Sequence, residues 1–584
     1  MKTMIKGKDA ALEESLEKMT AKLKEIGLDV EVASILNPLP HVWSAHIRDR
    51  NCKMSFTNGK GASKESALCS AYGEFLERMS CNYLHANWFL GQEIADGEFV
   101  HYPNERWFPI GDGTIPNDLM DEKLLNFYNP NNDLKMYHIV DNNSGNIKRG
   151  VCALPFVRQS DKKTIYIPMN IVGNLYVSNG MSAGNSVFET RVQCLSEIFE
   201  RAVKNKIILE EISLPTVPLE FLKKFPSILE GISKLEEAGF PVIVKDASLG
   251  GIYPVVNVTL LNPKNGGVYA SFGAHPNFEV ALERTLTELL QGRTLETLDV
   301  AQKPTFKSEA VSNHDNIEDH FIDSTGVISW KFFSNKSPYQ FTPWNFEGTT
   351  EAEYNYLMSL LKKENKEVYI ADYEHLGISA CRIIVPDYSE IYEVNDLIWD
   401  NNNRAIKYRT SILNIFELSN EELLELMDNL YDDAIDDYTL LSELISVPFD
   451  TDTLWGQITV GELKLLSSLV LGHFEEAQEL ASLYLEFGSC KQSQKNFYQA
   501  LESILIILNS EEELNVSDYV ETMNKLFGNQ IVKDALDSVN GVVKFVGLTP
   551  TDLNFKGLIQ AQNLQASYKK LQIAKKIYWE KNGN

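Results

Sequence analysis

Three short segments in the first half of the chain place acidic or amide side chains three positions apart, close to an arginine. They read Glu74-Phe75-Leu76-Glu77-Arg78, Glu197-Ile198-Phe199-Glu200-Arg201 and Glu288-Leu289-Leu290-Gln291-Gly292-Arg293. Residues three apart share one face of an α-helix, and apolar residues flank each pair. We therefore expect three half-buried helices that each carry one polar stripe. Ser70, Gln193 and Arg284 come one turn earlier and extend these stripes.

Carboxylates buried on such stripes need compensating positive charge, because an unpaired buried charge costs several kcal/mol. The neighbouring arginines could supply it, and so could a divalent cation. A site rich in carboxylates and free of Cys and His favours a hard cation such as Mg²⁺. Mg²⁺ commonly recruits phosphate oxygens as further ligands, and arginines bind phosphate groups in bidentate fashion. The alternative is an ion-pair network without a ligand, which three similar copies make less plausible.

Each polar stripe is predicted to follow a strand and a glycine-containing turn. Gly59 and Gly273 lie fifteen residues before the first glutamate of their segments, and Gly180 lies seventeen before. Short β-branched runs bounded by Gly, Pro or Asn predict strands, and longer segments between them have helical periodicity. The strand runs are residues 42–47, 242–244, 255–261 and 379–385. Residues 1–400 are thus expected to form an α/β (α+β) domain with internal strand–turn–helix repeats.

The chain changes character near residue 400. Beyond Asn401-Asn402-Asn403, leucines and acids at helical spacing dominate, which predicts an all-α domain over residues 401–584. The run Leu471-Gly472-His473-Phe474-Glu475-Glu476-Ala477 resembles the turn of a tetratricopeptide repeat. A generic helical hairpin is the alternative. We expect this part to serve docking or dimerisation, and a fragment ending near Asn401 to bind the ligand alone.

The composition of the chain limits which partners the protein can bind and in which cellular compartment it is expected. The formal net charge of −27 opposes binding to nucleic acid or to an anionic membrane surface. No run approaches the roughly 18 apolar residues of a transmembrane helix, and the first residues lack the apolar segment of a signal peptide. The seven cysteines form no C-x-x-C pair. Together these features predict a cytoplasmic protein with reduced thiols.

The ordered motifs resemble the three signatures of the YcaO family. Gly59-Lys60-Gly61 with Ser70-x3-Glu74-x2-Glu77-Arg78 is similar to the first signature. The second corresponds to Ser182-x2-Asn185-x3-Glu189-x3-Gln193-x3-Glu197-x2-Glu200-Arg201, and the third to Arg284-x3-Glu288-x2-Gln291. The resemblance covers roughly residues 1–400. The helical remainder is similar to stand-alone proteobacterial members, which carry a tetratricopeptide-like C-terminal domain.

The resemblance implies an ATP- and Mg²⁺-binding domain with a fold of its own. It implies five magnesium ligands, namely Glu74, Glu77, Glu197, Glu200 and Glu288. It also implies nucleotide contacts from the signatures and from the N-terminal segment, namely Lys8, Ser15, Ser182, Asn185, Glu189, Gln193, Arg201 and Arg284. The resemblance identifies no general base.

The resemblance further implies a reaction class. Peptide-cyclising members use ATP to phosphorylate a backbone amide oxygen, and a Cys, Ser or Thr side chain or external sulfide is the nucleophile. Many of them end in a proline-rich tail, whereas the last proline here is Pro550. Stand-alone relatives are linked instead to β-methylthiolation of an aspartate in a small-subunit ribosomal protein, alongside a radical-SAM methylthiotransferase. We expect a protein or peptide substrate, such partners, and a homodimer.

Two other functions are compatible with the residues. A carboxylate-bridged two-metal hydrolase would explain the glutamates, and phosphodiester cleavage without ATP would support it. A non-catalytic adaptor that binds ATP as a structural ligand would bind nucleotide without turnover, even with its partners present.

Overall fold

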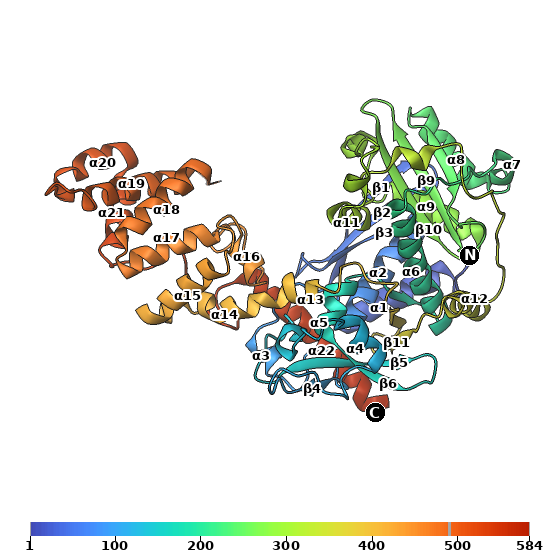
Figure 1. Ribbon diagram of the computed structural model, residues 1–584, viewed down its shortest axis with the longest axis horizontal. Coiled ribbons are helices and arrows are strands. Elements are labelled where there is room, and N and C mark those ends of the chain that lie inside the picture. Colours follow the sequence, from blue (N-terminus) through green and yellow to red (C-terminus); the bar gives the residue numbers. More distant parts are fainter. Residues whose placement is uncertain (1, 489–491, 583–584) are drawn as a thin grey trace.

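The computed structural model describes residues 2–488 and 492–582, which form a mixed α/β body and a helical arm (Figure 1). The four strands predicted from sequence are present as β2 (Val42–Asp49), β8 (Val242–Asp246), β9 (Val255–Asn262) and β12 (Ser379–Ile384). The predicted change to an all-helical segment after residue 400 is also confirmed. Within the described ranges, every helix is too short or too polar to cross a membrane. Six cysteines are free thiols, and Cys490 lies outside the described residues.

Two three-stranded antiparallel sheets support the helices that carry the first and third polar stripes. The first has the order β1–β2–β3, with β1 at Val30–Leu39 and β3 at Phe56–Gly61. Helix α2 (Lys64–Ser80) packs on it, and α1 (Leu12–Glu25) packs on α2. The second has the order β10–β9–β8, with β10 at Gly267–Ala274, and is covered by α9 (Phe278–Leu289) and α8 (Pro226–Glu237).

A six-stranded sheet completes the body. Its order is β4–β5–β11–β12–β7 with β6 paired to β5, and its neighbouring strands run antiparallel. Helix α6 (Val187–Leu209) packs on β12 and β7, and α12 (Thr350–Lys363) packs on α6. The other strands are β4 (Arg106–Phe108), β5 (Val151–Arg158), β6 (Thr164–Pro168), β7 (Met181–Gly184) and β11 (Tyr369–Tyr373). Shorter helices join them: α3 (Gln92–Ala95), α4 (Glu122–Tyr128), α5 (Met169–Ile171), α7 (Leu219–Leu222), α10 (Ser308–Val311), α11 (His314–Ile322) and α13 (Asp396–Trp399).

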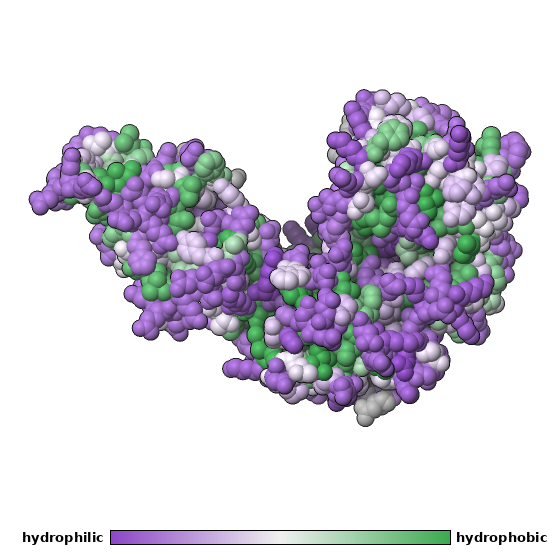
Figure 2. All heavy atoms as spheres, in the orientation of Figure 1, coloured by the Kyte–Doolittle hydropathy of each residue, from purple (hydrophilic) through white to green (hydrophobic). Residues whose placement is uncertain are grey.

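The helical arm extends away from the body, and Figure 2 shows an open notch between the two, with mostly hydrophilic residues on the visible surface. Leu463, Leu466 and Leu501 are fully or almost fully buried in its core. The predicted turn near residue 472 is confirmed, because Gly472 ends α17 with φ +77° and α18 follows at once. The arm consists of α14 (Ala405–Leu413), α15 (Asn420–Asp432), α16 (Leu441–Leu444), α17 (Val460–Leu471), α18 (Phe474–Phe487), α19 (Gln492–Leu508), α20 (Val520–Phe527) and α21 (Asn529–Val539).

The last helix, α22 (Ile559–Asn582), leaves the arm and returns to the body (Figure 1). Its Ala561 belongs to the arm core, whereas Tyr568 and Leu571 belong to the core around α2. Tyr568 Oη donates a hydrogen bond to the Val100 carbonyl at 2.6 Å. The helical segment after residue 400 is therefore not a separate appendage, because its final helix packs into the body.

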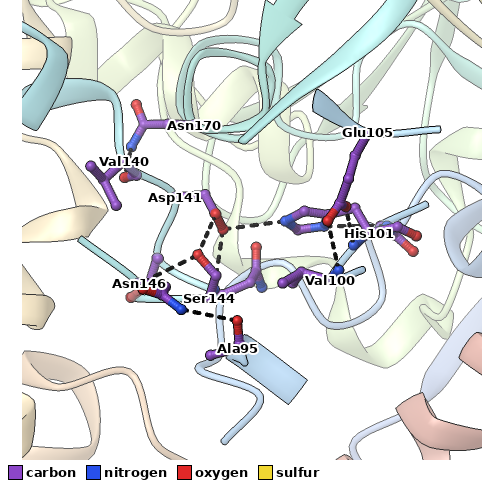
Figure 3. A network of polar contacts seen from close by, with 12 residues as sticks. Ala95, Val100, His101, Glu105, Val140, Asp141, Ser144, Asn146 and Asn170 are labelled. Atoms are coloured by element: carbon purple, nitrogen blue, oxygen red, sulfur yellow. Dashed lines mark hydrogen bonds and ion pairs between the residues drawn. The ribbon is translucent and has the colours of Figure 1, made fainter. Parts of the chain in front are cut away.

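Buried polar groups fix the segment on which α22 docks. Lys575 of α22 is fully buried, and its Nζ donates to the His101 carbonyl at 2.7 Å and to Asn82 Oδ1. Figure 3 shows the other side of this contact, where the His101 ring meets the Asp141 carboxylate at 3.2 Å. Glu105 accepts from the His101 N–H at 2.7 Å. Since Asn82 closely follows the end of α2, this network joins α22 to the helix that carries the first polar stripe.

Candidate functional site

One cavity of about 1050 Å³ lies between α2, α6, α9 and the N-terminal segment. The residues that the family resemblance assigned to ATP and Mg²⁺ come from four separate parts of the chain, and all of them line this cavity. They are Lys8, Ser15, Glu74, Glu77, Ser182, Asn185, Glu189, Gln193, Glu197, Glu200, Arg201, Arg284 and Glu288. Their individual roles as ligands stay predictions.

Close contact between a strand and the following helix brings the polar stripes together. A Cβ atom on Gly59 would lie 2.1 Å from the Ala67 carbonyl of α2, and one on Gly273 would lie 2.2 Å from Thr285 Oγ1 of α9. These two glycines lie inside β3 and β10, so their predicted placement in turns is wrong. Gly180 does lie in a turn, with φ +77°. The fifteen-residue spacing thus reflects a helix packed directly on strand backbone.

The close packing of β3 on α2 leaves no space for a side chain at Gly59. Gly59→Ala should lower the free energy of unfolding by about 1–3 kcal/mol, because the added methyl group would clash with the backbone of α2. Gly73→Ala is the matched control within α2, where the added Cβ would meet only Met19 Sδ at 4.0 Å. It should raise stability by about 0.5–1 kcal/mol through helix propensity. Chemical denaturation measures both. Equal effects of the two variants would contradict the packing argument.

The first stripe presents one paired and one unpaired carboxylate. Glu74 Oε1 accepts from Arg78 Nη2 at 2.6 Å. Among the described residues, the Glu77 carboxylate forms no hydrogen bond or salt bridge, although the charges of Arg78 and Arg382 act on it. Burial raises the pKa of Glu77 well above its ordinary value, and the charges of Glu197 and Glu74 add to the effect. Burial also raises the pKa of Glu74, against the opposing effect of Arg78.

The second stripe repeats this arrangement on α6. Arg201 donates to Glu197 Oε1 through Nε at 3.0 Å and Nη2 at 2.9 Å. The carboxylate of Glu200 also lines the cavity and forms no hydrogen bond or salt bridge in the described part of the chain. Two carboxylates, Glu77 and Glu200, therefore line the cavity without a direct salt bridge among the described residues.

The third stripe departs from the sequence-based prediction. Helix α9 ends at Leu289, so Gln291 follows the helix rather than sharing its face with Glu288. Gln291 Nε2 donates to the Asn58 carbonyl at 2.9 Å. Glu288 forms an ion pair with Lys60 of β3. The third segment thus contributes one acid to the cavity, and that acid is held by a lysine from the first segment.

The proposed nucleotide contacts form hydrogen-bonded pairs across elements. Lys8 Nζ lies 3.3 Å from Glu189 Oε1, and Ser15 Oγ donates to Asn185 Oδ1 at 2.8 Å. Asn185 Nδ2 in turn donates to Glu189 Oε2 at 3.0 Å. These contacts hold the N-terminal segment against the start of α6. Ligand contacts at this end would therefore come from a preformed network.

Two further groups line the cavity with unsatisfied polar atoms. Arg284 Nη1 donates to Gln193 Oε1 at 2.6 Å, while Arg284 Nε is buried without a hydrogen-bond partner among the residues that the structure describes. Ser182 Oγ is likewise buried, with no partner among the same residues. Buried polar atoms of this kind are uncommon and favour a ligand that completes their hydrogen bonds.

The donor set fits Mg²⁺ together with a phosphate-bearing ligand. Among residues 2–488 and 492–582, no group of three or more Asp, Glu, His or Cys side chains lies close enough together to coordinate a metal ion without further ligands. Arg78, Arg201 and Lys60 hold three of the five acids, and Glu77 and Glu200 remain available. Oxygen ligands on one or two carboxylates, completed by phosphate oxygens, are the usual environment of Mg²⁺. The carboxylates alone do not form a closed cage.

Two lysines of the cavity, the partly exposed Lys60 and the buried Lys204, were not singled out from the sequence. Lys60 and Lys204 both have a pKa lowered to about 8, by burial first and then by Arg284 and Arg201 respectively. Lys204 Nζ donates to the His320 carbonyl at 2.7 Å. The glycines on both sides of Lys60 could have marked it as a functional residue in the sequence. Lys204 lies on α6 beyond the second signature, and no sequence feature marked it.

Comparison with known proteins gives two matching family models. Residues 58–389 match the YcaO cyclodehydratase family, described as ATP- and Mg²⁺-binding, and residues 405–577 match the YcaO cyclodehydratase C-terminal domain. The chain is 49% identical over 584 residues to the ribosomal protein S12 methylthiotransferase accessory factor YcaO of Escherichia coli K12, covering 99% of this chain and 100% of the relative. It is also 49% identical, over 99% of each chain, to a Haemophilus influenzae relative described as an uncharacterized protein. The structure of YcaO from Methanopyrus kandleri bound with AMPPCP and Mg²⁺ aligns with TM-score 0.38 and 19% identity, covering 66% of this chain and 93% of that one.

Proposed function

The chain belongs to the YcaO family, whose domain binds ATP and Mg²⁺, and from that premise we propose that it uses ATP to activate an amide or acyl oxygen of a protein substrate. We further propose that this activity supports β-methylthiolation of a ribosomal protein. The observation that carries the proposal is the cavity, which is lined by Arg284 and by Glu77 and Glu200, two acids without a salt bridge among the described residues. The name of the E. coli relative, an accessory factor for S12 methylthiotransferase, supports the biological role.

The cavity residues divide into groups with different tasks. Glu77 and Glu200 would bind Mg²⁺ directly. The other three acids would join them after their salt bridges to Arg78, Arg201 and Lys60 have broken; these acids are Glu74, Glu197 and Glu288. The unpaired Nε of Arg284 and the hydroxyl of Ser182 would donate to the nucleotide. When bound, Mg-ATP supplies a phosphoryl group that makes an amide oxygen a better leaving group than hydroxide. The chain contributes positioning and charge neutralisation.

Phosphate release with and without partners tests this function. The protein is incubated with Mg-ATP, the small-subunit ribosomal protein and the radical-SAM methylthiotransferase, and release of phosphate is measured. We expect release to rise by at least about tenfold when substrate and partner are both present. Mass spectrometry of the ribosomal protein reports modification of its aspartate. ATP binding without any turnover under these conditions would support the adaptor alternative instead.

A further inference from the structure

We propose that Lys60 is a phosphate-binding residue of the ATP site and contacts the terminal phosphates once Mg²⁺ has taken the Glu288 carboxylate. This inference deepens the proposed function, since it rests on binding of Mg-ATP in the cavity described above. Lys60 lies between two glycines in the segment Gly59-Lys60-Gly61, and its Nζ forms an ion pair with the Glu288 carboxylate.

The backbone of β3 aims Lys60 into the cavity. Successive residues of a strand point to opposite faces. Thr57, Gly59 and Gly61 face α2: Thr57 Oγ1 donates to the Ala71 carbonyl at 2.9 Å, and a Cβ on Gly61 would lie 2.1 Å from Ser66 Oγ. The residues between them, Asn58 and Lys60, line the cavity. The two glycines thus let the strand approach α2 closely while the lysine between them points toward the site.

The electrostatic surroundings of Lys60 come from all three polar stripes. Glu74 of α2, Glu197 and Glu200 of α6, and Arg284 of α9 all act on its charge. The Lys60 side chain is 19% exposed, so water can solvate its ammonium group only in part. Lys60 therefore lies where the three groups of proposed ligands converge.

Release of Glu288 would leave this ammonium group without a partner. The pair is only partly buried, since the Glu288 side chain is 38% exposed, so the unpaired ammonium group would keep part of its hydration and would still be attracted to a new anion beside it. Mg²⁺ is a hard divalent cation that competes for the Glu288 oxygens, and the phosphate oxygens that arrive with it are the nearest new anions. A lysine binds phosphate as a mobile point charge, so a small rotation of its side chain can exchange one anion for the other. The ion pair seen here is then the ligand-free state of a phosphate-binding lysine.

Nucleotide titrations of the full-length protein test this assignment. Lys60→Met removes the charge, and Lys64→Met is the matched control, because Lys64 is exposed at the start of α2 and does not line the cavity. Mg-ATP affinity is measured by calorimetry, and AMP affinity by displacement of a bound fluorescent ATP analogue. We expect Lys60→Met to weaken Mg-ATP binding by about tenfold to one-hundredfold, as for loss of one charge-assisted contact. AMP binding should change by less than about threefold, and Lys64→Met should change neither.

Equal losses for ATP and AMP would overturn the assignment, because they would mean that Lys60 only shapes the cavity. Unchanged ATP affinity would overturn it as well. If Lys60→Met fails to fold, Lys60→Gln retains a hydrogen bond to Glu288 without the charge and is judged by the same two affinities. Failure of the wild-type protein to bind Mg-ATP would instead refute the proposed function, so the two failures are distinguishable.

Discussion

Glu77→Gln is expected to abolish Mg²⁺-dependent ATP binding while leaving the protein folded. Glu77 is a cavity carboxylate without a salt bridge in the described part of the chain, so its loss removes a hard ligand and breaks no direct ion pair. Calorimetric titration with Mg-ATP should show an affinity at least about one-hundredfold weaker, or no measurable heat. Near-wild-type affinity would rule out a magnesium-binding role for this residue.

The thermal stability of the same variant provides an independent readout. Burial raises the pKa of Glu77, so the folded state disfavours its charged form. Stability contributed by this group therefore falls as pH rises from the ordinary pKa toward the raised one, and the penalty is present at neutral pH. Glu77→Gln should have an unfolding temperature equal to or above that of the wild type without ligand, and should lose the increase on adding Mg-ATP. The exposed Glu65→Gln of the same helix is the control and should keep that increase.

A fragment that ends near Asn401 is expected to lose nucleotide binding. The sequence alone predicts the opposite, because all three polar stripes precede residue 401. The structure places α22 against the body, where Tyr568 and Leu571 are almost fully buried in the core around α2. Removing the helix would expose this core. Hydrogen exchange and Mg-ATP titration of the fragment should show a loosened α2 and little or no binding. A folded fragment with wild-type affinity would contradict this prediction.

Two point variants in α22 compare the loss of buried hydrogen bonds that dock the helix with the loss of an exposed ion pair. Lys575→Ala leaves Asn82 Oδ1 without its lysine donor and leaves the His101 carbonyl with only the longer bond from Asn82 Nδ2 at 3.3 Å, and it should cost about 2–4 kcal/mol of unfolding free energy. Lys576→Ala removes an exposed ion pair with Glu98, 2.7 Å long, and should cost less than about 1 kcal/mol. Urea denaturation measures both. Similar costs would mean that the buried contacts of Lys575 do not anchor the helix.

The polar stripes were predictable because helical spacing fixes which residues share a face. Spacing alone placed Glu74 with Glu77, and Glu197 with Glu200, on one face of a helix each, and their assignment to one common site came from the resemblance to the YcaO family. Gln291 was misplaced by the same reasoning, because spacing does not reveal that α9 ends at Leu289.

Contacts between distant segments were not predictable from local patterns. The pairing of Lys60 with Glu288 joins β3 to α9, and nothing in either segment specifies the other. The glycines of β3 and β10 looked like turn residues, because a glycine needed for close helix packing and a glycine needed for a turn are identical in sequence. Helical periodicity assigns α22 to the all-helical segment together with the arm helices, and its return to the body depends on tertiary contacts such as those of Tyr568 and Lys575.

The return of α22 also affects the order in which the protein can fold during its synthesis. Domains generally fold as they leave the ribosome, N-terminal first, at about 5–20 residues per second. The core around α2 includes Tyr568 and Leu571, which are made after the entire arm. At that rate the segment from residue 400 to 559 takes on the order of 10 s. During this interval the nascent body exposes the apolar surface that α22 later covers, and it would be open to chaperones. Nucleotide binding would then begin only after the last helix has emerged.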